Sequence, residues 1–122
     1  MAVKTLLNQV SAMQTANGNT SDIDWGAYKE LALDAVCTNK QGTSPTLQII
    51  VYRKDAAGNY QHIHQITQSV SGASVSTPVY FVASIGVGCS INQSFGSTGR
   101  INWVIGGTAT PGATFNLSLI GK

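Results

Sequence analysis

Residues 28–38 read YKELALDAVCT, and apolar and polar side chains alternate along most of this stretch. The apolar positions are Leu31, Leu33, Ala35 and Cys37. A strand would place these four side chains on one face, because successive residues of a strand point to opposite sides. Good helix formers also occur here, but the spacing follows a period of two and not of 3.6. The stretch therefore predicts a β-strand that buries one face.

Similar strand patterns occur along the rest of the chain. They cover residues 3–12, 23–25, 46–54, 60–67, 79–85, 101–105 and 115–119. Residues 55–59, DAAGN, predict the turn of a hairpin. About eight short antiparallel strands predict an all-β fold, a single antiparallel β-sandwich, with the jelly roll as one topology that the pattern allows. We expect one domain over residues 1–122, with an extended N-terminal arm over residues 1–12.

The chain is poor in charge: 10% of its 122 residues are charged, and its net charge is +2. Few charges mean weak repulsion between neighbouring molecules, which suits a protein that packs against others. Arg53 and Lys54 are the only adjacent basic pair, whereas nucleic-acid binding needs clustered cations. No apolar run has the length of a membrane span, and the first nine residues lack a signal-peptide core. We therefore expect no nucleic-acid or membrane partner, and synthesis in a cytoplasm.

Candidate catalytic and metal-binding residues are few. His62 and His64 are two residues apart, which would place both on one face of a strand, but a metal site needs a third ligand. Asp22 and Asp24 are spaced like a pair of catalytic carboxylates, yet nothing nearby would drive their pKa values apart. Ser94 lacks the leading glycine of a nucleophile elbow. We expect no enzymatic activity, no cofactor and no bound metal.

Two stretches are candidate contact loops. Residues 14–21, QTANGNTS, are polar and contain the turn signal Asn17-Gly18. Residues 86–99 contain four glycines, with Phe95 beside the third. The ring of Phe95 either contacts a partner or packs beneath its own loop.

The two tryptophans differ in their surroundings. Trp103 lies in the alternating run of residues 101–105, which favours the core. Trp25 lies at the end of a short strand, where both a core position and a ring that stacks on a sugar are open.

One short segment of the sequence has a second, similar copy. Residues 42–47, GTSPTL, resemble residues 107–111, GTATP, which lead into the last strand. Both are interpreted as turns that start a strand, because the regular period of a repeat protein is absent.

Five segments resemble those of small virion proteins of tailed bacteriophages. They are residues 3–7 (VKTLL), 17–22 (NGNTSD), 28–36 (YKELALDAV), 42–47 (GTSPTL) and 103–108 (WVIGGT). The shared features are short strands and turns rich in Gly, Ser, Thr and Asn. The resemblance implies a virion β-sandwich, with the role of a capsid decoration (cement) protein on the outer head shell.

This resemblance also implies partners and a location. The partners would be the major capsid protein and further copies of the chain in a homo-oligomer, and the location would be the capsid surface of the virion. For the contacts with these partners we expect Asn17, Asn19, Trp25 and Phe95. The alternatives are a tail, neck or fibre component of the virion, or a carbohydrate-binding β-sandwich module.

Overall fold

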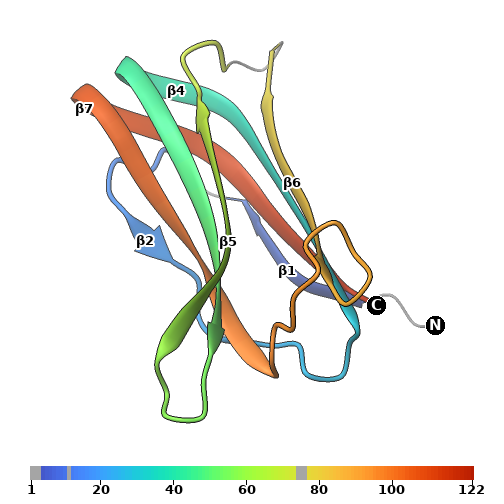
Figure 1. Cartoon of the computed structure of the whole chain (residues 1–122). Helices are drawn as coiled ribbons and strands as arrows, with labels where there is room; N and C mark the ends of the chain where they lie inside the picture. The colour runs from blue at the N-terminus through green and yellow to red at the C-terminus, as the bar shows by residue number, and fades with distance from the viewer. Residues whose placement is uncertain (1–3, 11, 74–76) are drawn as a thin grey trace.

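The computed structural model of the chain describes residues 4–10, 12–73 and 77–122. Over these residues the protein consists of seven strands joined by turns and loops (Figure 1). The strands are β1 (Lys4–Val10), β2 (Gly18–Asn19), β3 (Ile23–Asp24), β4 (Glu30–Lys54), β5 (Tyr60–Ser69), β6 (Val79–Gly86) and β7 (Thr98–Gly121). No helix that is long and apolar enough to cross a membrane occurs in the described part of the chain.

Strands β4 and β7 are 25 and 24 residues long and form the central ribbon of the sheet. Their antiparallel pairing extends from Leu31 opposite Gly121 to Arg53 opposite Gly99. Strands β6 and β1 flank one half of this ribbon, which we call the β6 half. Strands β5, β2 and β3 flank the other half, which we call the β5 half. All seven strands therefore belong to one hydrogen-bonded sheet.

The central ribbon bends where residues 42–46 of β4 meet residues 106–112 of β7, and we call this bend the corner. Three non-glycine residues of the corner have positive φ angles: Ser44 (48°), Ala109 (57°) and Thr110 (55°). Gly42 has a φ of 94°, and a Cβ atom there would lie 2.8 Å from the carbonyl oxygen of Thr108, so only glycine fits. Both strands turn back at the corner, and the two halves face each other (Figure 1).

The two similar sequence segments, residues 42–47 and 107–111, form the two sides of this corner. Thr43 of the first segment lies opposite Thr108 of the second. Each segment was expected to be a turn between separate strands, but each is a bend inside one continuous strand. Irregular pairing and positive φ angles let a strand change direction and still keep its neighbour.

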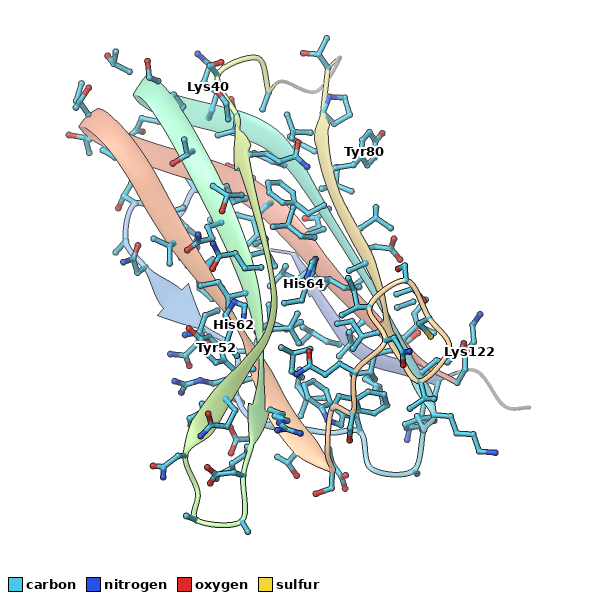
Figure 2. The ribbon with its side chains drawn as sticks, viewed as in Figure 1. Lys40, Tyr52, His62, His64, Tyr80 and Lys122 are labelled. Carbon is cyan, nitrogen blue, oxygen red and sulfur yellow. The ribbon has the colours of Figure 1, made fainter. Side chains whose placement is uncertain are left out.

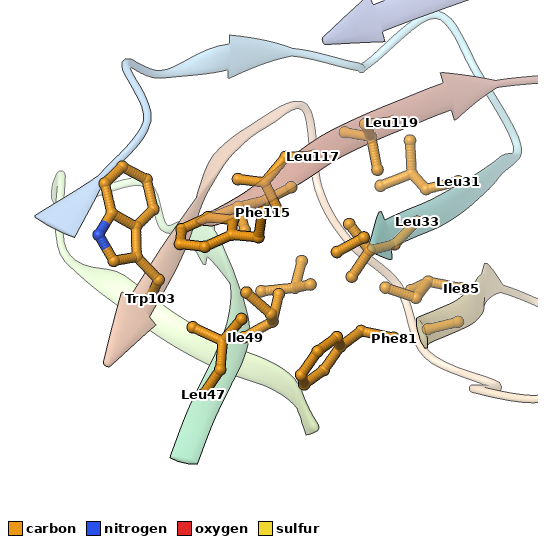
Figure 3. Packing of buried hydrophobic residues seen from close by; sticks show 14 of the residues in the cluster. Leu31, Leu33, Leu47, Ile49, Phe81, Ile85, Trp103, Phe115, Leu117 and Leu119 are labelled. Carbon is orange, nitrogen blue, oxygen red and sulfur yellow. The ribbon is translucent and has the colours of Figure 1, made fainter. Parts of the chain in front are cut away.

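The core lies between the inner faces of the two halves (Figure 3). Alternate residues of the strands are buried there, among them Leu31, Leu33, Ala35, Cys37, Leu47, Ile49, Val51, Phe81, Ile101, Phe115, Leu117 and Leu119. The predicted burial of one face of residues 28–38 is confirmed, and so is the core position of Trp103. Each Leu, Ile, Val or Phe among them stabilises the fold by about 1.5–3 kcal/mol on burial, so this cluster is the main source of stability.

The predicted all-β antiparallel fold is confirmed, but its division into strands differs. The strands expected over residues 28–38 and 46–54 are both parts of β4, and those over 101–105 and 115–119 are both parts of β7. Because the pairing of β4 and β7 continues around the corner, the sheet is one curled sheet. The finer prediction of a two-sheet sandwich with a jelly-roll topology is not confirmed.

The start of the chain is part of the sheet. Within the expected N-terminal arm, Lys4–Val10 form β1 and pair with the end of β7, whereas residues 1–3 and 11 lie outside the described residues. The loop expected over residues 14–21 contains β2, which pairs with β7.

Candidate functional site

Hydrogen bonds connect the predicted contact loop of residues 14–21 to β7. The side-chain oxygen of Asn17 accepts a hydrogen bond of 2.9 Å from the backbone N–H of Ile105. The indole N–H of Trp103 donates to the carbonyl of Ala16 at 3.2 Å. Asn17 and Asn19 are exposed, so the structure keeps both at the surface.

The other two predicted contact residues, Trp25 and Phe95, are in the core. Trp25 is fully buried and Phe95 is 6% exposed. Their rings pack edge to face with 6.1 Å between centroids, and the Trp25 indole donates a 2.9 Å hydrogen bond to the Phe95 carbonyl. Neither ring offers a surface to a partner, which corrects the expectation for both residues. They hold the loop between β6 and β7 against the segment that precedes β4.

In the described part of the chain, three large hydrophobic side chains are exposed, and all lie on β6 or just after it. They are Tyr80 (58% exposed), Val82 (65%) and Val87 (79%), and we call them the β6 strip. Sequence reasoning did not find the strip. The available signal was the unbroken apolar run VYFVA at residues 79–83, because such a run makes both faces of a strand apolar. An apolar group of this kind on a polar surface is typical of a contact with another protein.

The backbone beside the strip faces an edge that is open in part: β4 pairs with the opposite edge of β6, and Ile85 near the end of β6 forms a bridge with Ile91. The carbonyl of Ser84 accepts a 2.9 Å hydrogen bond from the N–H of Ile91, and the carbonyl of Tyr80 accepts one of 2.7 Å from the Gln68 side chain. Both carbonyls thus point away from β4. Along a strand, the N–H and C=O groups of successive residues point to opposite edges. Val82 lies midway between Tyr80 and Ser84, so its N–H and C=O also point to this edge. The carbonyls of Tyr80 and Ser84 already accept hydrogen bonds, so the backbone groups that a partner would meet here are those of Val82.

An apolar hollow of about 450 Å³ lies at the Val87 end of the strip. Tyr28 and Lys29 line it from the segment before β4, and Val87 and residues 93–96 line it from the loop between β6 and β7. Its volume is that of a pocket for a side chain or a small ligand. The predicted contact loop of residues 86–99 therefore carries a surface feature, although Phe95 itself is buried.

A polar network on the surface of the β5 half is centred on Asp22. Its carboxylate accepts hydrogen bonds from the Tyr60 hydroxyl at 2.5 Å and from the Lys54 ammonium at 3.0 Å. The Tyr60 hydroxyl first, and then Lys54, hold the pKa of Asp22 below its ordinary value. In return, Asp22 raises the pKa of Tyr60 and of Lys54. The guanidinium of Arg100 lies 3.8 Å from the centroid of the Tyr60 ring.

The two histidines of β5 do not share a face. A β-bulge interrupts the pairing of β4 and β5, so that Val51 lies opposite His64 and the next residue, Tyr52, lies opposite His62. Val51 faces the core, so His64 lies on the inner side and His62 on the outer side (Figure 2). The expectation of one shared face is therefore wrong. Among the residues that the structure describes, no three His, Cys, Asp or Glu side chains gather as metal ligands would.

No protein-family model, curated protein or solved structure matches this chain. The surface features that bear on its function are the β6 strip, the hollow beside it and the polar face of the β5 half.

Proposed function

We propose that the chain is a structural protein of a bacteriophage virion, a decoration protein that binds the outside of the head shell. The observation that carries this proposal is the β6 strip, whose three exposed apolar side chains lie beside a strand edge that is open at Val82. The resemblance of several segments to virion proteins and the 10% charge content also support it. The proposed partner of the strip is the major capsid protein.

The size of the strip indicates how such a protein would bind. Full burial of a side chain like Val or Tyr contributes about 1.5–3 kcal/mol. Three side chains therefore contribute several kcal/mol, and the loss of freedom on association costs a comparable amount. One copy alone would bind weakly, so we propose a homo-oligomer whose copies contact neighbouring capsomers and gain affinity by avidity. Binding to the assembled shell alone would then stabilise that shell by mass action.

Co-sedimentation with purified expanded heads that lack the protein tests this proposal. We expect saturable binding with a fixed number of copies per head. The double variant Val82→Ser/Val87→Ser removes two side chains of the strip and should weaken binding at least tenfold, a loss of about 1.4 kcal/mol or more. The control is Val104→Ser, which changes a half-buried valine on β7 in the β5 half and should bind like the wild type.

Two results would overturn the proposal. Absence of binding to heads at high protein concentration would exclude decoration. Labelling of intact virions on the tail, neck or fibres alone would assign the protein to those structures instead.

A further inference from the structure

The outer face of the β5 half carries an ordered row of polar and aromatic side chains. Arg100 of β7 lies directly opposite Tyr52 of β4, and Tyr52 lies directly opposite His62 of β5. The three side chains therefore extend across three neighbouring strands, about 4.8 Å apart. The rings of Tyr52 and His62 meet edge to face, with 6.0 Å between their centroids (Figure 2).

A row of amides lies beside this first row. Asn19 of β2 is paired with Asn102 of β7, and Asn102 lies opposite Ile50. Ile50 points to the outer face and is still only 7% exposed, so its neighbours cover it closely. The side-chain oxygen of Asn102 is buried and has no hydrogen-bond partner within the described part of the chain, so Asn102 belongs to the floor of this surface. We call Arg100, Tyr52, His62, Asn19 and Asn102 the outer platform.

Arg100 is the cation of this platform that forms no direct ion pair among the described residues. No carboxylate of the described residues lies within ion-pair distance of its guanidinium, and its buried Nε atom has no hydrogen-bond partner among them. The nearby carboxylate, that of Asp22, is bound by Lys54 at 3.0 Å and by the Tyr60 hydroxyl. The guanidinium of Arg100 also makes a cation–π contact with the ring of Tyr60, whose centroid is 3.8 Å away. A planar guanidinium held in this way presents its remaining N–H groups to an anionic oxygen.

We propose that the outer platform binds an acidic saccharide. Arg100 would receive the carboxylate, the rings of Tyr52 and His62 would pack against the sugar, and the exposed amide of Asn19 would bind its hydroxyls. This site lies on the half of the molecule that does not carry the β6 strip, so it does not depend on the binding of heads.

The charge of the platform favours a saccharide over nucleic acid. A nucleic-acid site has to neutralise several phosphates, and each takes a cation. Here Lys54 is already paired with Asp22, which leaves Arg100 as the cation without a carboxylate partner on the platform. One such cation matches one carboxylate on a largely neutral ligand.

Isothermal titration of the whole protein with two matched probes tests this inference. The first probe is tetragalacturonate, and the second is its methyl ester, which has the same rings but no free carboxylates. We expect binding of the acid and at least tenfold weaker binding of the ester. This comparison uses the wild-type protein, so it does not depend on the folding of a variant.

Variants then locate the site. Arg100→Gln should weaken binding of the acid at least tenfold, whereas Lys40→Gln, a half-buried lysine next to the corner, should leave it unchanged. Circular dichroism would check that both variants are folded. The inference is overturned by absence of binding at millimolar acid, by equal binding of acid and ester, by equal effects of the two variants, or by tighter binding of a short oligonucleotide.

Discussion

Gly99 occupies a position in β7 at which no side chain fits. A Cβ atom there would overlap the carbonyl oxygen of Tyr52 and the ring of Trp25. We expect Gly99→Ala to lower the free energy of unfolding by about 3 kcal/mol, because both neighbours are held in place by the sheet and the core. Gly72→Ala is the control, since nothing lies within 4 Å of that position, and it should change stability by less than about 0.5 kcal/mol. Urea denaturation measures both, and equal effects would contradict this packing.

The sequence around Trp25 could not reveal that the residue is buried. It lies next to a glycine and at the end of a two-residue strand, which is typical of exposed positions as well. Burial depends on Phe95, which is 70 residues away and packs against it from another loop. When the burial of a residue depends on contacts this distant in sequence, the local sequence pattern cannot predict it. Trp103 was predictable, because it belongs to a long alternating run.

The pH dependence of stability should report the network around Asp22. The Tyr60 hydroxyl and then Lys54 lower the pKa of Asp22 in the folded state from its ordinary value of 3.8. A lowered pKa means that the network contributes stability above pH 3.8, and that this contribution is lost as the pH falls through the folded pKa. Tyr60→Phe removes the first donor, so its stability deficit should shrink on acidification from about pH 6 to about pH 2. Thermal unfolding across this range measures it, and a constant deficit would contradict the network.

At the scale of elements, the alternation of apolar and polar residues located the strands. It did not show that two pairs of expected strands are joined into the single strands β4 and β7. Residues 42–47 contain Gly, Ser, Thr and Pro, which in most proteins indicate a turn, and residues 107–111 are alike. The structure uses the same residues for a corner inside β4 and β7. Because the two segments are cross-strand partners, their similarity in sequence reflects a shared bend. Local composition cannot distinguish such a bend from a turn, since both need residues that tolerate positive φ angles.

The candidate sites were predictable to different degrees. The polar loop with Asn17 and Asn19 was found from its composition, and both residues are exposed. The opposite faces of His62 and His64 were not predictable, since one bulged residue reverses the alternation that places a side chain. The β6 strip was missed because an apolar run predicts burial on both faces, whereas β6 is an edge strand with one face open.

At the corner and in the strand beside it, the same substitution, Ala→Gly, should change the free energy of unfolding in opposite directions. Ala109 has a φ of 57°, where an L-residue is strained by about 1–2 kcal/mol, whereas glycine is not. Glycine costs about 0.5–1 kcal/mol in chain entropy, so we expect Ala109→Gly to raise the free energy of unfolding by up to about 1 kcal/mol. Ala113→Gly, at a buried strand position, should lower it by about 1 kcal/mol or more. Urea denaturation measures both, and destabilisation by both variants would contradict the strain at residue 109.

At the scale of the whole molecule, the curled sheet couples its two halves through shared strands. Each half contains one part of β4 and one part of β7, so neither half can lose its pairing without affecting the same two strands in the other. The core is shared as well. Leu33 from the β6 half and Ile49 from the β5 half belong to one buried cluster, and Trp103 packs against Phe115 with 5.5 Å between ring centroids. Within the described residues, both the paired strands and the core continue from one half into the other.

We therefore expect unfolding in a single cooperative transition. Leu33→Ala and Ile49→Ala remove fully buried side chains from opposite halves, and each should lower the free energy of unfolding by about 2–5 kcal/mol. In each variant the transition followed by far-ultraviolet circular dichroism should coincide with that followed by tryptophan fluorescence. Two separate transitions, or a shift of one probe only, would show that the corner acts as a hinge between independent units. Coincident transitions in both variants would show instead that β4 and β7 transmit a loss of packing from either half to the whole sheet.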